Sequence, residues 1–432
     1  MTLFLYNLLL PAALLVYLPV FIYKQLKRGN VLRNFGERFG VFSRTQHAAL
    51  KRLHNPVWIH AVSVGETVAA LGFIRRWQQR NPELDFVLSV TTTTGHAMAE
   101  KKLPDGVCLI YCPVDFPLAV RRALRLVRPR MLVIFEVEIW PNLVAAAVRR
   151  GAEVVLVNGR MSDRSARGYR RWRWFFGPTF RRFSLFCMQS DEDVKRIRAV
   201  IGDAVPAISC NTMKFDQVPD MDTRAKAELL DAAFGPAPRR VWVAGSTHAG
   251  EETLIAEVYD RLKQAAPDLK LVLVPRHQER TVEVEEVLKA RGLNYCLRQP
   301  VEGSPEPDGA RDVLLVNSTG ELMSFYAAAD IAFVGKSLAG QAGGHNIIEP
   351  AIFGKVVTHG SAMGNFRLVV DIFREAEAAI EVPADAALLQ VMLRLIDDPA
   401  ECAELGRRAR QVVEKCRGAM DRTIDALEKL GR

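Results

Sequence analysis

The sequence predicts an α/β protein with two Rossmann-like, doubly wound parallel sheets and an N-terminal membrane helix. Short apolar runs alternate with helix-like stretches, and this alternation occurs twice, on either side of a proline-containing segment. A long uncharged run precedes both series. The chain has 432 residues, of which 25% are charged and 49% hydrophobic, so the composition is globular and the length favours two large domains.

The uncharged run extends from Leu3 to Tyr23 and is long enough for a membrane helix. Its 21 residues would form a helix about 30 Å long, the hydrocarbon thickness of a bilayer. No Lys or Arg precedes the run, and five follow it between Lys24 and Arg38, so the positive-inside rule places the remaining chain in the cytoplasm. A cleaved signal peptide would carry a preceding positive charge and a small-residue cleavage site. A buried or interfacial helix is the alternative.

Eleven apolar runs are predicted to be buried strands. The first series contains Val57–Val62, Phe86–Val90, Cys108–Tyr111, Met131–Phe135, Val154–Val157 and Leu185–Met188. The second contains Val241–Ala244, Leu271–Val274, Val313–Val316, Ile331–Val334 and Val356–Thr358. Helical patterns such as Thr67–Gln79 and Pro141–Arg150 lie between them, which is typical of parallel βαβ units.

This pattern predicts four segments. We expect a membrane anchor at residues 1–28, an N-terminal domain at 29–217, a linker at 218–238 and a C-terminal domain at 239–432. Ligands of open α/β sheets bind at the carboxyl ends of the strands, so we expect a cleft between the two sheets.

The charge and the cysteines restrict the class of partner. A net charge of +9 favours an anionic partner: nucleic acid, an anionic membrane or a phosphorylated substrate. The seven cysteines have no zinc-finger spacing and are expected to be reduced thiols of a cytosolic protein. Between Arg160 and Phe176, arginines interleave with tryptophan and phenylalanine, which suits phosphates at a lipid interface. RNA binding and a solvated amphipathic helix are the alternatives, although no RNP-type motif accompanies the segment.

Two strand ends of the first series carry carboxylates. In VWIHAVSVGET, Glu66 follows a buried strand at the expected start of a helix. An acid is favourable in the first turn of a helix, and a catalytic base at the mouth of a cleft is the second interpretation. In FEVEIWPN, Glu136 and Glu138 directly follow another apolar strand, and two acids among apolar neighbours indicate at least one functional charge.

Strand ends of the second series predict a nucleotide site. The stretch GKSLAGQAGGHNIIEPA, from Gly335 to Ala351, brings glycines, and therefore bare backbone N–H groups, to the start of a helix, a favourable place for phosphate. Glu349 follows one turn later and is able to accept hydrogen bonds from both ribose hydroxyls. Arg276, after another strand, supplies a fixed cation for a phosphate or a carboxylate. The alternative is a structural Gly-rich turn.

Eight motifs occur in a fixed order after the uncharged run: HAVSVGE, TTTTG, EVEIWPN, NGRMSDRS, NTMKFD, AGSTHAGEE, VPRH and GGHNIIEPA. Together they closely resemble the Kdo transferases (3-deoxy-D-manno-octulosonic acid transferases) of Gram-negative lipopolysaccharide synthesis, over nearly the whole chain. The resemblance implies a GT-B fold, CMP-Kdo as donor, a lipid A precursor (lipid IVA) as acceptor, and inversion at the anomeric carbon. It also implies that no metal or other cofactor takes part and that the enzyme works at the cytoplasmic face of the cell inner membrane.

The resemblance also implies site residues. By motif, Glu66 matches the general base, and Glu136 and Lys214 match residues that help to stabilise the transition state. The residues that match CMP contacts are Pro275, Arg276, Gly320, Glu321, Leu322, Asn346, Ile347, Ile348 and Glu349.

Two other functions fit parts of the sequence. One is a lipid-linked GT-B glycosyltransferase that uses a UDP-sugar. The other is a membrane-anchored, two-lobed protein that binds nucleic acid or an anionic ligand without turnover and does not need Glu66. The acidic clusters Asp191–Asp193 and Asp220–Asp222 superficially match a metal-binding DxD motif. We interpret the first as a capped helix start and the second as linker.

Overall fold

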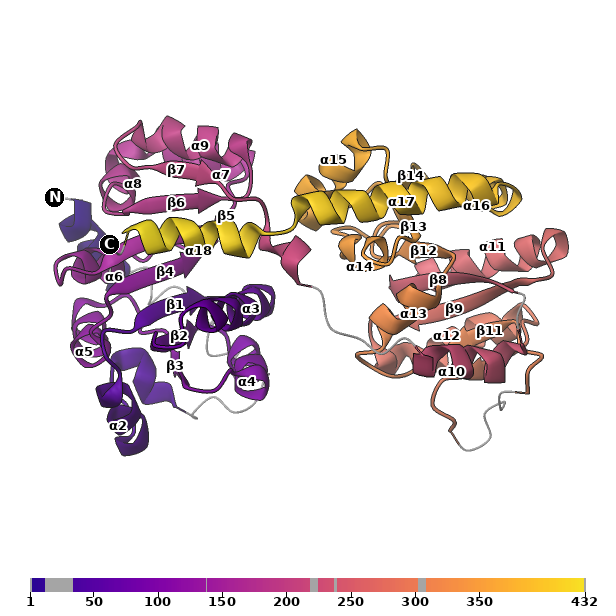
Figure 1. The fold of residues 1–432 in the computed structure, drawn as a ribbon, viewed down its shortest axis with the longest axis horizontal. Coiled ribbons are helices and arrows are strands. Elements are labelled where there is room, and N and C mark those ends of the chain that lie inside the picture. Colours follow the sequence, from indigo (N-terminus) through magenta and orange to yellow (C-terminus); the bar gives the residue numbers. More distant parts are fainter. Residues whose placement is uncertain are drawn as a thin grey trace. The chain divides into compact units, whose positions relative to one another are not determined.

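The computed structural model describes residues 2–11, 34–136, 138–217, 224–236, 239–301 and 308–430 (Figure 1). The chain divides into two compact units. The N-terminal unit consists of Met1–Gln217 together with Gly418–Arg432, and the C-terminal unit consists of Val218–Arg417. Each unit is a parallel sheet with helices on both faces (Figure 1).

The sheet of the N-terminal unit has seven strands in the order β3-β2-β1-β4-β5-β6-β7, all parallel. The strands are β1 (Val57–Ala61), β2 (Phe86–Val90), β3 (Val107–Tyr111), β4 (Met131–Phe135), β5 (Glu153–Gly159), β6 (Leu185–Met188) and β7 (Ala207–Ser209). The central strands β1, β2 and β4 are buried along their whole length, which explains their continuous apolar sequences.

Alternate residues of these strands face two separate apolar layers. Trp58 packs in the layer that contains side chains of α2, α5, α6, α8 and α9, whereas Val57 and Ile59 pack in the layer of α3, α4 and α18. The helices and turns of this unit are η1 (Phe35–Phe39), α2 (Arg44–Arg52), α3 (Val64–Arg80), α4 (Thr93–Lys102), α5 (Pro117–Val127), α6 (Pro141–Val148), α7 (Asp163–Arg171), α8 (Arg173–Phe180), α9 (Asp191–Ile201), η2 (Met213–Asp216) and α18 (Ala419–Leu430).

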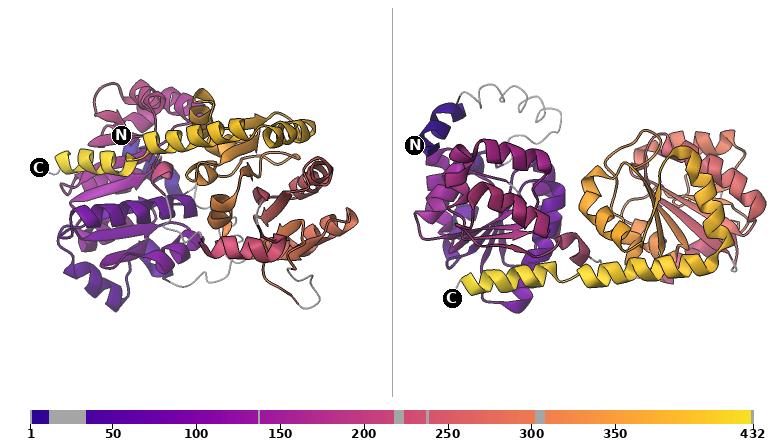
Figure 2. Two further views of the ribbon diagram at one scale, coloured as in Figure 1. Left: turned by 45° about the vertical axis from the view of Figure 1, so that its right-hand side comes forward. Right: turned by 90° about the horizontal axis from the view of Figure 1, so that it is seen from above.

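The last helix, α18, corrects one predicted boundary. We expected residues 239–432 to form a single domain, but α18 belongs to the N-terminal unit. It buries Met420, Ile424 and Leu427 in the same apolar layer as α3. Burying each such side chain contributes about 1.5–3 kcal/mol, which explains why the chain returns to this unit. Figure 2 shows α18, in yellow, lying along the N-terminal unit.

The sheet of the C-terminal unit also has seven parallel strands, in the order β10-β11-β9-β8-β12-β13-β14. The strands are β8 (Arg240–Thr247), β9 (Leu269–Pro275), β10 (Tyr295–Leu297), β11 (Val313–Leu315), β12 (Ile331–Val334), β13 (Val356–Gly360) and β14 (Ile380–Val382). The helices and turns are α10 (Arg224–Phe234), α11 (Glu251–Ala265), η3 (Gln278–Arg280), α12 (Thr281–Ala290), α13 (Leu322–Ala328), α14 (Ile348–Ala351), η4 (Gly364–Phe366), α15 (Arg367–Glu375), η5 (Asp385–Ala387), α16 (Leu388–Asp397) and α17 (Pro399–Cys416).

Part of the predicted linker, residues 218–238, is integral to the C-terminal unit. Helix α10 buries Leu230 and Ala233, and its carbonyl groups accept hydrogen bonds from Gly309 and Arg311. Residues 218–223 and 237–238 lie outside the described part of the chain.

The predicted N-terminal membrane helix is only partly within the described residues. Residues 2–11 are helical, whereas residues 12–23 of the uncharged run lie outside the described ranges. Among the helices that the structure describes, none is both long enough and apolar enough to cross a membrane. The described segment contacts the N-terminal unit, since the side-chain amides of Asn7 and Asn142 exchange hydrogen bonds of 3.0 and 2.7 Å.

Candidate functional site

The strand order places a switch point in each sheet. In the N-terminal unit the connections run outward in opposite directions from the adjacent strands β1 and β4. In the C-terminal unit the same reversal occurs between β8 and β12. Crevices at the carboxyl ends of such strands are the usual ligand sites of open α/β sheets. The predicted catalytic residues follow strands of the first sheet, and most of the predicted CMP-binding residues follow strands of the second.

Glu66 lies in the first turn of α3, directly after β1. Its carboxylate is nearly buried and accepts hydrogen bonds from the backbone N–H of Val62 (2.9 Å) and from the Ser63 hydroxyl (2.8 Å). The backbone N–H of Glu66 donates to the Ser63 hydroxyl (3.2 Å), which completes a capping box. The first-turn interpretation of Glu66 is therefore confirmed, and a role as catalytic base remains to be tested.

Glu136 follows β4 in a strained backbone conformation. Its φ is 55°, in the left-handed region that costs a non-glycine residue about 1–3 kcal/mol and that clusters at functional sites. Burial, and then the charge of Glu66, raise the pKa of the Glu136 carboxyl, whereas Lys214 and Arg160 lower it. Glu66 and Lys214 therefore both lie close enough to Glu136 for their charges to act on its carboxyl.

Glu138 is the third carboxylate at this switch point. Burial and the charges of Glu66 and Glu136 raise its pKa to about 7. Burial is the largest cause of this shift, and the two neighbouring carboxylates add to it because a nearby negative charge disfavours the ionised form of Glu138.

Two cations offset the carboxylates. Lys214 lies in η2, between the fully buried side chains of Met213 and Phe215. Burial lowers the pKa of Lys214, the nearby Glu136 raises it, and Arg160 lowers it. Arg160 immediately follows β5, and the sequence predicted it only as the start of the arginine-rich segment, not as a neighbour of these carboxylates. Its position directly after β5, at the carboxyl end of a predicted strand, is the sequence signal that would have identified it as a residue of this site.

The surface formed by α7 and α8 is rich in arginine and aromatic side chains. None of the residues of α7 is buried, and Trp172 and Trp174 are 49% and 50% exposed. Tyr169 of α7 is partly buried against the same apolar layer as Ile139 and Trp140, and burial and the charge of Glu138 raise its pKa.

In the C-terminal unit, Arg276 and Glu349 lie near the switch point between β8 and β12. Burial raises the pKa of Glu349 to about 7, while Asn346 and Arg276 lower it. The Asn346 side-chain amide donates to Glu349 Oε1 at 3.4 Å. The structure thus brings together Arg276, Asn346 and Glu349, which the sequence analysis had placed in one site.

The other predicted CMP contacts have different environments. Pro275 is the last residue of β9, paired with Thr247 of β8. Gly320 adopts a φ of 88°, and Glu321 binds Arg298 at 3.1 Å at the start of α13. This helix reaches the site through Tyr326, whose pKa is raised by burial and by Glu349. The side chains of Ile347 and Ile348 are buried, and that of Leu322 is half-buried. Any contact of these three residues with a nucleotide would therefore be made mainly by their backbone groups.

Several of the backbone amides that the Gly-rich loop was predicted to present are already occupied by partners within the protein, including those of Gly343 and Gly344. The buried Glu251 carboxylate accepts hydrogen bonds from the backbone N–H groups of Lys336 (2.7 Å), Ser337 (2.9 Å) and Leu338 (3.1 Å). The N–H groups of Gly343 and Gly344 donate to carbonyl groups at 2.8 and 2.9 Å. Gly344 has a φ of 70°, and a Cβ there would collide with Met363, which is the physical reason for glycine. Glu251, second from the end of the β8-loop motif AGSTHAGEE, was missed.

A histidine pair lies beside this loop. The Nε2 atoms of His248 and His345 are 3.0 Å apart, and their rings stack with centroids 5.3 Å apart. Burial and the surrounding cations, among them Lys336 and Arg276, lower the pKa of both rings to about 4. Because both rings are therefore neutral near pH 7, one Nε2 atom donates the hydrogen bond between them and the other accepts it. The positive surroundings favour an anionic ligand.

The acidic cluster Asp191–Asp193 is a capped helix start, as predicted. The Ser190 hydroxyl accepts a hydrogen bond from the backbone N–H of Asp193, and Asp193 accepts one from the N–H of Met161. The second cluster, Asp220–Asp222, lies outside the described residues.

Comparisons with known proteins agree with this architecture. Residues 33–217 match the family model of the 3-deoxy-D-manno-octulosonic-acid transferases (kdotransferases). The chain is 34% identical over 400 residues to the 3-deoxy-D-manno-octulosonic acid transferase of Bordetella pertussis, covering 90% of each chain. It is 32% identical over 374 residues to that of Haemophilus influenzae, covering 86% of each.

A solved glycosyltransferase from Rickettsia africae shares the fold, with a TM-score of 0.57 at 12% identity, over 88% of this chain and 100% of that one. This likeness shows a fold of the GT-B type, with two parallel-sheet α/β domains in one chain. Since relatives above 30% identity are covered over most of their length, the chain belongs to the 3-deoxy-D-manno-octulosonic acid (Kdo) transferases, the glycosyltransferases that transfer Kdo in lipopolysaccharide synthesis.

Proposed function

We propose that the protein transfers Kdo from CMP-Kdo to the lipid A precursor lipid IVA, with inversion at the anomeric carbon and without a metal ion. The observation that carries this proposal is the group formed by Glu66, Glu136 and Lys214 after strands of the N-terminal sheet, in which the charges of Glu66 and Lys214 both act on Glu136. A proton acceptor beside a half-buried carboxylate and a cation suits the attack of a sugar hydroxyl on an activated sugar.

Glu66 acts as the general base in this proposal. The acceptor hydroxyl oxygen forms a bond to the anomeric carbon, the bond from that carbon to the phosphate oxygen breaks, and CMP leaves with the electron pair. The hydroxyl proton passes to Glu66. Glu66 Oε2 accepts one hydrogen bond, from the N–H of Val62, and so retains a lone pair for the incoming proton.

Glu136 and Lys214 stabilise the charges that develop during transfer. The anomeric carbon gains positive character, which the Glu136 carboxylate stabilises, and the departing phosphate gains negative charge, which Lys214 stabilises. The strained backbone at Glu136 supports a functional role, because such strain persists where the surrounding structure requires that side chain in one place.

The C-terminal unit binds the donor. Arg276 pairs with an anionic group of CMP-Kdo, and Glu349 accepts hydrogen bonds from the ribose hydroxyls. The segments Gly320–Leu322 and Asn346–Ile348 contact the nucleotide beside them. The neutral histidine pair among cations supports this choice, because such surroundings favour a ligand that carries a phosphate and a carboxylate.

In this proposal, the N-terminal unit binds the lipid acceptor and contacts the membrane. The arginine-rich surface of α7 and α8, with Trp172 and Trp174 exposed, suits lipid phosphates and the interface of a bilayer. The uncharged run Leu3–Tyr23 anchors the protein in the cell inner membrane, with the catalytic domains in the cytoplasm. A variant that lacks Met1–Tyr23 should lose co-sedimentation with vesicles of inner-membrane lipids and still turn over detergent-dispersed acceptor.

The experiment that tests the proposed function uses the full chain in detergent, CMP-Kdo and the tetra-acylated lipid IVA. Mass spectrometry of the lipid should show the mass of the acceptor increased by Kdo, with release of CMP. Competition with free CMP should inhibit far more strongly than competition with UDP. An unchanged acceptor in the presence of folded protein, or equal inhibition by UDP, would contradict the proposal and favour a UDP-sugar donor.

A further inference from the structure

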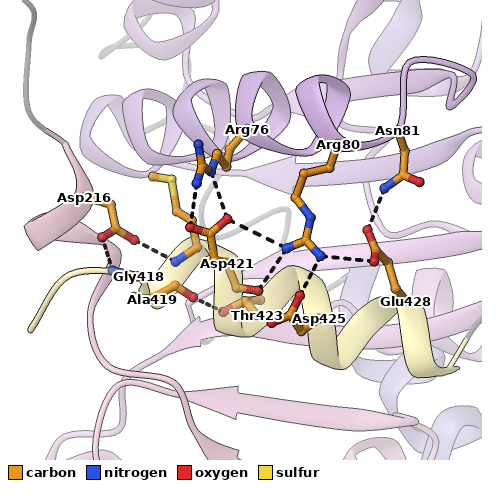
Figure 3. Close-up of polar contacts among 11 residues, drawn as sticks. Arg76, Arg80, Asn81, Asp216, Gly418, Ala419, Asp421, Thr423, Asp425 and Glu428 are labelled. Carbon is orange, nitrogen blue, oxygen red and sulfur yellow. Dashed lines mark hydrogen bonds and ion pairs between the residues drawn. The ribbon is translucent and has the colours of Figure 1, made fainter.

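The segment that carries Lys214 is tied to the last helix of the chain by one carboxylate. Asp216 is the last residue of η2. Its two oxygens accept hydrogen bonds from the backbone N–H groups of Gly418 and Met420, each 2.6 Å long. Figure 3 shows Asp216 beside the N-terminus of α18. Gly418 precedes α18 and has no side chain to cap it, so Asp216 supplies the capping carboxylate from elsewhere in the sequence.

This contact lies where the chain leaves and re-enters the N-terminal unit. The chain leaves after Gln217, one residue beyond Asp216, and re-enters at Gly418, which Asp216 binds. The outgoing and returning segments are therefore joined within the N-terminal unit by the carboxylate of Asp216.

The turn η2 needs such contacts to hold its shape. It is a single 3-10 turn of four residues, too short to be stable by itself. At its start, the N–H of Met213 donates to Asn158 Oδ1 at 3.1 Å, and the N–H of Lys214 donates to the Thr212 hydroxyl at 3.4 Å. At its end, Asp216 attaches it to α18.

Helix α18 is held in the N-terminal unit mainly by its buried apolar side chains, and exposed ion pairs with α3 lie beside them. Arg76 of α3 forms two hydrogen bonds with Asp421, of 2.8 and 2.9 Å, and Arg80 pairs with Asp425 at 2.5 Å (Figure 3). Helix α3 is the helix that begins with the capping box of Glu66. The same helix α18 thus contacts the two elements that carry Glu66 and Lys214.

We propose that Asp216 is a positioning residue for Kdo transfer, which holds Lys214 in place by fixing η2 to the N-terminus of α18. This inference rests on the proposed function of Lys214. Asp216 itself touches neither substrate, and its effect on the reaction passes through Lys214.

The test measures turnover of the full-length protein with CMP-Kdo and lipid IVA for Asp216→Ala, Lys214→Ala and the double variant. Asp216→Ala should lower kcat roughly 10- to 100-fold, the usual result of displacing a catalytic group by about 1 Å, while the Kd for CMP stays at its wild-type value. The double variant should be no slower than Lys214→Ala alone, because Asp216 acts through Lys214.

The matched control is Arg80→Ala, which removes a contact of α18 that does not involve η2. It should lower the unfolding midpoint and leave kcat unchanged. If Asp216→Ala does not fold, Asp216→Asn replaces it, since the amide retains one acceptor oxygen and has almost the same size.

Three results would overturn the inference. The first is a folded Asp216 variant with wild-type kcat beside an inactive Lys214→Ala, which would leave the proposed function intact. The second is a double variant in which the two losses multiply, which would show that Asp216 acts independently of Lys214. The third is a fully active Lys214→Ala, which would remove the proposed role of Lys214 as well.

Discussion

Ser63 and Glu66 exchange hydrogen bonds at the N-terminus of α3. The Ser63 hydroxyl accepts from the backbone N–H of Glu66 at 3.2 Å and donates to Glu66 Oε1 at 2.8 Å. The residue proposed as the catalytic base is therefore also part of a helix cap. The two roles are separable by experiment, because capping contributes to the stability of the fold and proton transfer contributes to turnover.

Replacing Ser63 should affect stability more than turnover, because it removes the helix cap and one hydrogen bond to Glu66 Oε1 but leaves the bond from the N–H of Val62 to Glu66 Oε2. Ser63→Ala removes the acceptor for the N–H of Glu66 and should lower the free energy of unfolding by about 0.5–2 kcal/mol, with turnover within a few-fold of wild type. Denaturation with urea measures the change. Ser162→Ala is the matched control, because Ser162 caps α7 without a capping box. It should lower the free energy of unfolding by no more than Ser63→Ala does. An unchanged midpoint for Ser63→Ala would mean that the capping box contributes nothing to stability.

Glu349 should make nucleoside binding depend on pH. Burial raises its pKa to about 7, so below that pH the carboxyl of the free protein is protonated. Ribose hydroxyls bind the ionised form better, and the affinity should therefore rise with pH, by up to about tenfold per unit below pH 7. Cytidine is the suitable probe because it has the ribose and no titrating phosphate. Calorimetry at several pH values measures the dependence.

The same shift has a consequence for stability. The folded pKa of Glu349 is raised above the ordinary value of 4.5, so the folded state holds its proton at pH values where the unfolded state has lost it. The contribution of this group to stability should be greatest at low pH and decline as the pH rises from about 4.5 to about 7. Glu349→Gln should flatten both dependences. The same pH dependence of cytidine affinity in wild type and Glu349→Gln would show that another group titrates.

Activity should survive thorough treatment with EDTA. The leaving group is the phosphodiester of CMP, with one negative charge before cleavage, and not the diphosphate of a UDP-sugar. Fixed cations such as Arg276 and Lys214 are suited to stabilise that charge. Loss of turnover on chelation, with recovery on adding Mg²⁺ or Mn²⁺, would assign a ligand role to the acidic clusters.

The central strands and the edge strand β3 were predictable from sequence, and the other three edge strands were not. All eleven predicted runs are strands, because a strand buried on both faces is apolar along its whole length. The three strands that were missed, β7, β10 and β14, contain three residues each and lie at sheet edges. A run so short contains no periodic pattern, and at an edge its residues need not be apolar.

The site was predictable where a chemical signal lies close to a strand end or in a distinctive loop. Arg276 directly follows β9, and Asn346 and Glu349 end the Gly-rich motif that begins after β12; the structure brings the three together. Glu251 was not predictable, because its four backbone partners include three on a loop far along the chain. The return of α18 to the first unit was missed for the same reason: an amphipathic helix does not indicate which sheet it covers.

The most direct test of the account is the turnover of Glu66→Gln. Glutamine has the size of glutamate and retains an oxygen for the N–H of Val62, but it does not take up the acceptor proton. The CMP affinity should stay near the wild-type value. The free energy of unfolding should fall by only about 0.3–1 kcal/mol, because a charge at the helix N-terminus is lost. The rate of Kdo transfer should fall by about 10²- to 10⁴-fold, the usual contribution of a general base. A folded Glu66→Gln protein that transfers Kdo at nearly the wild-type rate would contradict the account, reduce Glu66 to a helix cap and leave Glu136 or Glu138 as the base.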